Sequence, residues 1–284
     1  MEKNERGDHT NENTRRNSSK NSSKNSSKDN EKKVVLVTGS GEGIGRGVAG
    51  VLASQGMHIA GLDIDAEANA QTAAQVEALG GLFLPLLCDV GDKLAVKQAV
   101  DAAVERFGKI DVLINNAGYW DNSSLIEGDY ESQTAEFDRA MGASGLGSYY
   151  VTRACIDHMS SGSNIIGMIT DHIKPGFLIT GSPAIGYDCA KFSMWRQTET
   201  WAIQLQPRGI RVNGLCFGAV DTPMLRGVTM ALQDTAMQPE DIGQAVLNIL
   251  AHPIYGPSGQ TWLVAKSHEP REVGLREIAE LATS

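Results

Sequence analysis

Several kinds of feature are missing from this chain, and each absence narrows what it can be. No apolar run in the 284 residues is long enough to span a bilayer, which argues against a transmembrane helix. The first residues hold no apolar stretch of the kind that a secretory signal peptide needs. The four cysteines form no CxxC pair and have no histidine at metal-ligand spacing, so we expect no metal site. Scattered thiols of this kind fit a reducing compartment, and we expect a cytoplasmic protein.

Positive charge is also in short supply. The chain has 25 Lys and Arg against 34 Asp and Glu, a net charge of −9. A general nucleic-acid binder needs cations for the phosphate backbone, so we expect neither a nucleic acid nor a membrane as partner. The length and the 41% hydrophobic content fit one α/β domain that is able to bury a core.

Residues 1–32 differ in composition from the rest of the chain. They contain almost no large apolar residue and repeat Lys-Asn-Ser-Ser between residues 17 and 28. Such a segment cannot bury enough surface to offset the entropy of ordering it. Its acidic residues also argue against a mitochondrial transit peptide. We therefore expect a disordered polar tail over 1–32 and a folded domain over 33–284.

A glycine-rich turn follows the first apolar run of that domain. Residues 33–38 predict a buried parallel strand, and residues 46–55 predict a helix from apolar residues at three-to-four spacing. Between them, residues 38–45 read TGSGEGIG. Glycines at a strand-to-helix turn are typical of a dinucleotide-binding site, where the helix N-terminus faces the phosphates. An ordinary turn between a strand and a helix is the alternative.

An acidic residue ends the next predicted strand, residues 57–63. A carboxylate about twenty residues past the glycines, here Asp63, can bind the ribose hydroxyls of the cofactor and would repel a 2′-phosphate. Glu42 adds negative charge, and no Arg or Lys lies between Thr38 and Gly45. The pattern therefore favours NAD over NADP. The alternative is that Asp63 merely begins the next helix, a role that Asp65 can also fill.

The β-α alternation continues along the chain. Residues 84–90 and 110–118 predict further strands, separated by an amphipathic helix over 93–107. We predict an α/β fold, a single doubly wound parallel-sheet (Rossmann) domain with its ligand crevice at the carboxyl ends of the strands.

Three motifs in this order resemble the short-chain dehydrogenase/reductase family, classical type. They are the glycine turn, the Asn-Asn-Ala-Gly sequence at 115–118, and Tyr187 followed four residues later by Lys191. The resemblance covers roughly residues 33 to 266 and implies a homotetramer or homodimer. It also implies a cofactor site, whose residues would be Gly39, Gly43, Ile44, Gly45, Asp63, Asp89, Val90, Asn116, Gly118, Tyr187, Lys191, Val220 and Thr222.

The resemblance implies catalytic roles as well. Tyr187 would be the general acid/base, and Lys191, one helical turn later, would lower its pKa and hold the nicotinamide ribose. Thr170, at the end of the strand over 163–170, takes the place of the family's serine. The segment between Thr170 and Tyr187 is longer than the family commonly shows, so Ser182 competes with Thr170 for that role. The remaining alternative is that Thr170 is only a strand-end residue.

One position departs from the family pattern. Ser144 stands where an asparagine usually holds a relay water, and three glycines lie within the six residues 142–147. A serine can hold a water but has a shorter reach. The relay role of Ser144 is therefore open.

The substrate side is predicted less sharply. Residues 225–238 occupy the place of the family's mobile lid, and their short length favours a small or medium substrate. Candidate pocket residues are Tyr119, Trp120, His172, Lys174 and Phe217. His172 and Lys174 would either meet an anionic group or simply be solvated, and Phe217 would either wall the pocket or pack. Residues 260–264 predict the last strand, and 270–281 a polar helix.

These observations predict an NAD-dependent dehydrogenase or ketoreductase acting on a small or medium secondary alcohol or ketone. Two alternatives stay open. The first is an NADPH-type 3-oxoacyl reductase of the same fold, which would need a basic surface patch to bind an acyl-carrier protein. The second is a non-catalytic NAD-binding sensor, suggested by the Ser144 and Thr170 substitutions.

Overall fold

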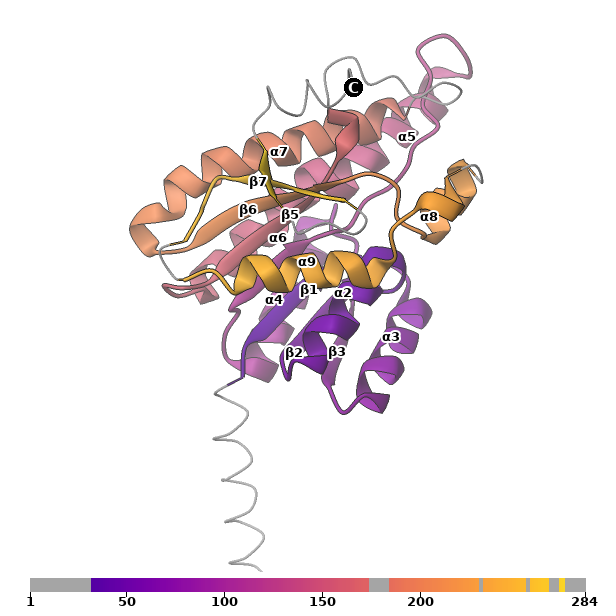
Figure 1. Cartoon of the computed structure of the whole chain (residues 1–284). Helices are drawn as coiled ribbons and strands as arrows, with labels where there is room; N and C mark the ends of the chain where they lie inside the picture. Colours follow the sequence, from indigo (N-terminus) through magenta and orange to yellow (C-terminus); the bar gives the residue numbers. More distant parts are fainter. Residues whose placement is uncertain (1–31, 174–183, 230–231, 254–255, 266–270, 274–284) are drawn as a thin grey trace, which may run out of the picture.

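The computed structural model describes residues 32–173, 184–229, 232–253, 256–265 and 271–273. Residues 1–31 of the predicted polar tail, Lys174, Ser182 and most of the helix predicted over 270–281 lie outside these residues. Within them the chain alternates strands and helices around one sheet (Figure 1).

The sheet has eight strands in the order β3-β2-β1-β4-β5-β6-β7-β8. All neighbouring pairs are parallel except β7 and β8. The doubly wound parallel sheet predicted from the sequence is therefore confirmed, with one antiparallel strand at its edge. The strands are β1 (Val34–Thr38), β2 (His58–Asp63), β3 (Leu82–Leu87), β4 (Val112–Asn115), β5 (Asn164–Thr170), β6 (Arg211–Phe217), β7 (Thr261–Val264) and β8 (Arg271–Val273).

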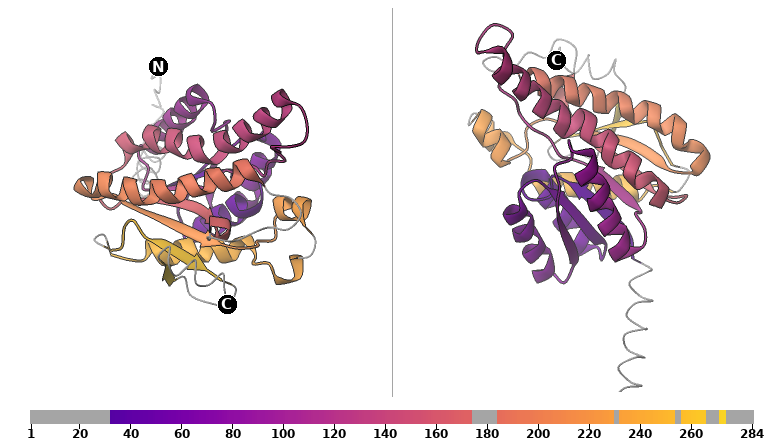
Figure 2. Two further views of the ribbon diagram at one scale, coloured as in Figure 1. Left: turned by 90° about the horizontal axis from the view of Figure 1, so that it is seen from above. Right: turned by 180° about the vertical axis from the view of Figure 1, so that it is seen from behind.

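Helices cover both faces of the sheet, as Figures 1 and 2 show. One face carries α2 (Gly43–Ser54), α3 (Ala66–Ala78) and α9 (Pro239–Leu250). The other carries α4 (Lys93–Phe107), α6 (Gly147–Cys155) and α7 (Ile185–Leu205). The remaining helices are α5 (Tyr130–Ala140), the π-helical turn η1 (Met141–Leu146) and the short α8 (Pro223–Val228).

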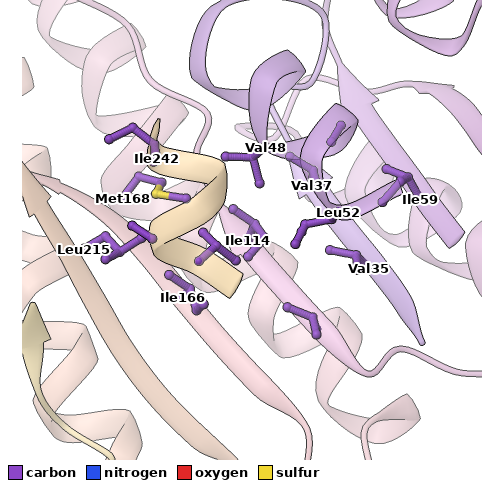
Figure 3. Close-up of a cluster of buried hydrophobic side chains, with 14 of the residues drawn as sticks. Val35, Val37, Val48, Leu52, Ile59, Ile114, Ile166, Met168, Leu215 and Ile242 are labelled. Atoms are coloured by element: carbon purple, nitrogen blue, oxygen red, sulfur yellow. The ribbon is translucent and has the colours of Figure 1, made fainter. Parts of the chain in front are cut away.

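Side chains alternate between the two faces along each strand and so feed two cores. In β1, Val35 and Val37 face the α2 and α9 side, while Val34 and Leu36 face the α4 and α6 side. Figure 3 shows the first cluster, where Val48 and Leu52 of α2 meet strand residues from β1, β4, β5 and β6. Strands buried on both faces explain why their sequences read as unbroken apolar runs.

Most predicted elements are found where they were expected. The helix predicted over 93–107 has the same bounds, because Asp92 caps its N-terminus and Gly108, at φ 80°, ends it. The region predicted as a helix over 270–281 is wrong at 271–273, which form β8. There β8 pairs with the outer edge of β7 and satisfies backbone groups that would otherwise be unpaired.

Within the residues that the structure describes, no helix combines the length and apolar character needed to cross a membrane. The same residues include no cluster of three or more His, Cys, Asp or Glu side chains arranged to hold a metal ion.

Candidate active site

A cleft of about 610 Å³ lies at the carboxyl ends of β1, β2, β4, β5 and β6. In a doubly wound sheet this is where ligands bind, next to the point where the strand order reverses, here between β1 and β4. Many of the residues predicted from the sequence line it together: Gly39, Gly43, Ile44, Asp63, Asp89, Val90, Asn116, Gly118, Tyr187, Lys191, Phe217 and Thr222.

The glycine turn has the backbone shape of a phosphate cradle. Gly39 and Gly43 have φ of 65° and 50°, a region that side-chain-bearing residues rarely adopt. A Cβ at Gly45 would overlap the carbonyl oxygen of Gly39, so α2 can pack this closely only with glycine there. Helix α2 begins at Gly43 and receives no side-chain cap from Glu42. Its first N–H groups therefore face the cleft with the positive end of the helix dipole, which suits a pyrophosphate.

Asp63 is held against this turn. Its carboxylate accepts hydrogen bonds from the Gly41 amide at 2.7 Å and the Asp65 amide at 2.8 Å. Asp65 in turn caps α3, so starting that helix is not the role of Asp63. The nearest cation, Arg46, donates its Nε to the Gly41 carbonyl oxygen at 3.0 Å and does not line the cleft. The rim near Asp63 is therefore acidic, with Glu42 exposed beside it.

The Asn-Asn-Ala-Gly sequence ties the turn to the centre of the sheet. Asn116 Nδ2 donates to the carbonyl oxygens of Thr38 and Gly39 at 2.9 and 3.0 Å. The Thr38 hydroxyl accepts from the Asn116 and Ala117 amides. A Cβ at Gly118 would lie 3.3 Å from Ser144 Oγ and 3.5 Å from Lys191 Nζ. The backbone at Gly118 therefore runs directly past the candidate catalytic side chains.

Tyr187, Lys191 and Thr170 come together at the ends of β5 and the start of α7. Thr170 lies close enough to Tyr187 for its hydroxyl to lower the pKa of the phenol. Lys191 is only 4% exposed, donates to the Met168 carbonyl oxygen at 2.9 Å, and holds Nζ 5.6 Å from the Tyr187 ring centroid. Thr170 ends β5, so its hydroxyl reaches Tyr187 in spite of the long intervening segment.

Burial shifts the pKa values of this pair in opposite directions. Desolvation raises the pKa of Tyr187, the charges of Asp188 and Asp171 raise it further, and the Thr170 hydrogen bond lowers it. Desolvation lowers the pKa of Lys191 to about 8. The sequence predicted that Lys191 lowers the tyrosine pKa, whereas in this structure burial is the largest cause of the shift and raises it.

Ser144 sits in a π-helical turn between α5 and α6. Its hydroxyl donates to the Ala117 carbonyl oxygen at 3.0 Å, and the side chain is buried. The glycines of the stretch do not simply weaken the helix. They widen it for one turn, a distortion often found at functional sites. The turn brings Ser144 to the Gly118 backbone, and its relay role stays a prediction.

Aromatic rings surround the Tyr187 ring on the substrate side. The Trp120 ring centroid lies 5.1 Å from that of Tyr187, and the His172 ring centroid lies 5.8 Å away. His172 Nδ1 lies 3.0 Å from Asp188 Oδ1, so the imidazole has an anionic partner and is not simply solvated. Phe217 both lines the cleft and packs in the first core cluster, so the two predicted roles coexist.

The segment after β6 closes the cofactor end of the cleft. Val220 is buried in a bridge to Met237, and Thr222 lines the cleft while its hydroxyl caps α8. Helix α8 occupies part of the predicted lid. Tyr119 also lines the cleft, where its hydroxyl donates to the Glu136 carboxylate.

Several cleft residues were not predicted from the sequence, including Cys88, Arg139 and Met168. Cys88 directly precedes the predicted Asp89, and burial raises the pKa of its thiol to about 12, so it is an inert wall. The loop residue Asp121 was also missed, since an acidic residue two positions after a glycine-tyrosine pair carries no sequence signal of its own.

Comparison with known proteins identifies the family. The family model described as "short chain dehydrogenase" matches residues 33–233. The chain belongs to the short-chain dehydrogenase family, which confirms the resemblance found in the sequence. It is an oxidoreductase with a nicotinamide-cofactor-binding fold.

The individual relatives differ in substrate and cofactor. A 3-oxoacyl-(acyl-carrier-protein) reductase of Thermotoga maritima is 30% identical over 227 residues, 76% of this chain and 89% of the relative. A short-chain dehydrogenase of Burkholderia cenocepacia J2315 in complex with NADP matches with a TM-score of 0.73 and 26% identity, over 82% of this chain and 96% of that one. A 3-ketoacyl-(acyl-carrier-protein) reductase of Brucella melitensis complexed with NADH matches with a TM-score of 0.72 and 26% identity, over 84% and 98%.

Proposed function

We propose that this chain is an NAD-dependent dehydrogenase acting on a small or medium secondary alcohol or the corresponding ketone. The observation that carries the proposal is that Tyr187 and the buried Lys191 line the cleft together, with Thr170 close to the phenol at the end of β5. NAD, when bound, supplies the nicotinamide that accepts or returns the hydride. The glycine turn, Asp63, Val90 and Thr222 would hold it.

In this proposal Tyr187 exchanges a proton with the substrate oxygen, and Thr170 orients that oxygen by a hydrogen bond. Lys191 Nζ favours the phenolate while it is protonated. Trp120, His172 and Phe217 would wall the substrate, and the aromatic surroundings favour a partly apolar molecule. Ser144 would hold a relay water below Lys191.

The preference for NAD rests on the acidic rim of the cleft. Asp63 is fixed beside the turn by two backbone amides, and the exposed Glu42 adds a second negative charge. A 2′-phosphate carries up to two negative charges and would meet both carboxylates.

The cysteines, all four unpaired, support a cytoplasmic enzyme. A homotetramer or homodimer is the assembly that we propose.

The first experiment follows NADH formation with a panel of secondary alcohols, polyols and hydroxy acids. Tyr187→Phe removes only the phenol oxygen and should lower kcat by about 10²- to 10⁴-fold, with NADH binding retained. Tyr130→Phe, on an exposed tyrosine of α5, is the matched control and should leave kcat unchanged. An active Tyr187→Phe enzyme would refute the role of the phenol.

The relative from Thermotoga maritima makes 3-oxoacyl thioesters the second substrate class to test, with NADPH as the reductant. Faster turnover of that pair than of any alcohol with NAD would favour a 3-oxoacyl reductase. Clear NADH binding with no turnover of either class would favour a non-catalytic sensor.

A further inference from the structure

Asp121 is a carboxylate in an unusual place. It lies in the loop between β4 and α5, three residues past Gly118, and is 0% exposed. Burying a carboxylate without partners is costly, so its hydrogen bonds show what it is there to hold. It accepts from the Tyr187 amide at 2.7 Å, the Gly186 amide at 3.0 Å and the Ser123 amide at 3.3 Å, and also from the Ser123 hydroxyl.

Two of these donors belong to the first turn of α7. The N-terminal amides of a helix lack partners within the helix and are usually capped by the side chain of the residue just before it. Here that residue is Ala184, which has no side-chain acceptor. Asp121 supplies the missing cap from a position 66 residues earlier in the chain, and it does so on the amide of Tyr187 itself.

The close approach of this carboxylate depends on glycine. A Cβ at Gly186 would lie 3.1 Å from Asp121 Cγ and 2.9 Å from the Ala140 Cβ. The neighbouring residue, Trp120, places its ring 5.1 Å from the Tyr187 ring. Consecutive residues of one loop therefore hold the backbone and contact the ring of Tyr187.

We infer that Asp121 is a positioning residue for the reaction proposed above, fixing the first turn of α7 so that the Tyr187 hydroxyl stays in register with Thr170. The inference rests on the proposed function. From β5, Thr170 lies close to the phenol and the Met168 carbonyl oxygen accepts from Lys191. Asp121 provides the anchor from the β4 side. Without it, Tyr187 sits in a helix end that frays.

The test compares Asp121→Ala and Asp121→Asn with Asp92→Ala. Asp92 caps α4 through the Leu94 and Ala95 amides, so its loss removes a helix cap away from Tyr187. A displacement of about 1 Å at a reacting group can cost about 100-fold, so kcat of Asp121→Ala should fall by about 10- to 100-fold. The Kd for NADH should stay within about twofold. Asp121→Asn keeps one acceptor oxygen and should fall in between.

A second measurement does not depend on turnover. Amide hydrogen exchange of Gly186 and Tyr187 should be slow in the wild type and fast in Asp121→Ala, while Asp92→Ala exposes only the first turn of α4. If Asp121→Ala fails to fold, Asp121→Asn and Ser123→Ala carry the comparison. Ser123→Ala removes a partner of the carboxylate without touching α7.

The outcomes separate this inference from the proposed function. A folded Asp121→Ala with unchanged kcat, or a parallel loss of kcat and NADH affinity, would reduce Asp121 to a structural cap. If the wild type turns over no member of the panel, the proposed function fails. The exchange of the two amides then still decides whether Asp121 fixes Tyr187, and unchanged protection in Asp121→Ala overturns that.

Discussion

At the scale of single residues, the proposed preference for NAD depends on two carboxylates. Asp63 is clamped by the Gly41 and Asp65 amides and cannot swing away from the cleft without losing both hydrogen bonds. Glu42 is exposed at the same rim. Arg46, the one cation in the turn and its helix, is engaged with the Gly41 carbonyl oxygen and Thr72. Among the described residues, no cation lines the cleft beside Asp63, and the nearby Arg46 and Arg226 line the adjoining pocket together with Glu42 and Asp65.

This arrangement predicts that Glu42→Arg combined with Asp63→Asn shifts the enzyme towards NADP. Asn keeps an acceptor for the Gly41 amide, so the turn should survive while the charge is removed. We expect the ratio of kcat/KM for NAD over NADP to fall by about 100-fold, roughly 3 kcal/mol. The control is Glu77→Arg, which repeats the Glu42→Arg substitution at an exposed position of α3. An unchanged ratio in the double variant would show that Asp63 and Glu42 do not select the cofactor.

The candidate catalytic residues differ in how well the sequence predicts their place in the cleft. Tyr187 and Lys191 could be predicted because four residues on a helix put both side chains on one face. Thr170 could be chosen over a later serine because a strand end has a defined place in a parallel sheet. Asp121 could not be predicted, since its role depends on a contact between amides and a carboxylate 66 residues apart in sequence.

At the scale of elements, the close packing of α2 against α9 follows from two glycines. A Cβ at Gly47 would lie 2.8 Å from the Pro239 carbonyl carbon, and one at Gly243 would lie 2.8 Å from the Val51 Cβ. Gly50, one turn after Gly47 on the same helix, has open space around its Cβ position. These helices cover the core that also supports the glycine turn.

The pair Gly47 and Gly50 therefore makes a matched prediction. Gly47→Ala should destabilise the protein by about 1–3 kcal/mol, because the new methyl group overpacks the helix interface. Gly50→Ala should stabilise it by about 0.5–1 kcal/mol, because alanine loses less backbone entropy in a helix. Urea unfolding of both variants checks this. Equal effects of the two substitutions would contradict the packing account.

The elements that sequence reasoning missed share a cause. The π-helical turn at Met141–Leu146 and the strand Arg271–Val273 both depend on distant partners. At Gly147 a Cβ would lie 2.8 Å from Val90 Cγ2, so the turn is shaped by the cleft wall as well as by its own residues. Strand β8 exists only in its pairing with β7. Local patterns predicted the parallel strands and α4 well. Apolar runs that are buried on both faces, and the residues that cap a helix, are recognisable from residues close together in the sequence.

At the scale of the whole molecule, the catalytic pair has a cost in stability that varies with pH. Lys191 is buried, and desolvation lowers its pKa to about 8 from an ordinary 10.5. Below pH 8 both folded and unfolded chains carry the charge, and the folded chain bears the full burial penalty. Between pH 8 and pH 10.5 the lysine of the unfolded chain is protonated more than that of the folded chain. The contribution of Lys191 to the free energy of unfolding should therefore rise with pH in this range. Burial raises the pKa of Tyr187 above its ordinary 10, so above pH 10 this residue acts with the opposite sign.

Lys191 should therefore contribute a rise in stability between about pH 8 and pH 10, which the buried thiols of Cys88 and Cys155 oppose above pH 9. Lys191→Met should remove the contribution of the lysine and leave that of the thiols. The expected difference in slope amounts to about 2 kcal/mol across the window. Lys97→Met, which removes an exposed lysine paired with Asp101 on α4, should leave the slope as in the wild type. Urea unfolding at several pH values between 7 and 10 gives the comparison. If Lys191→Met and the wild type keep parallel profiles, the lysine is not desolvated in the folded protein.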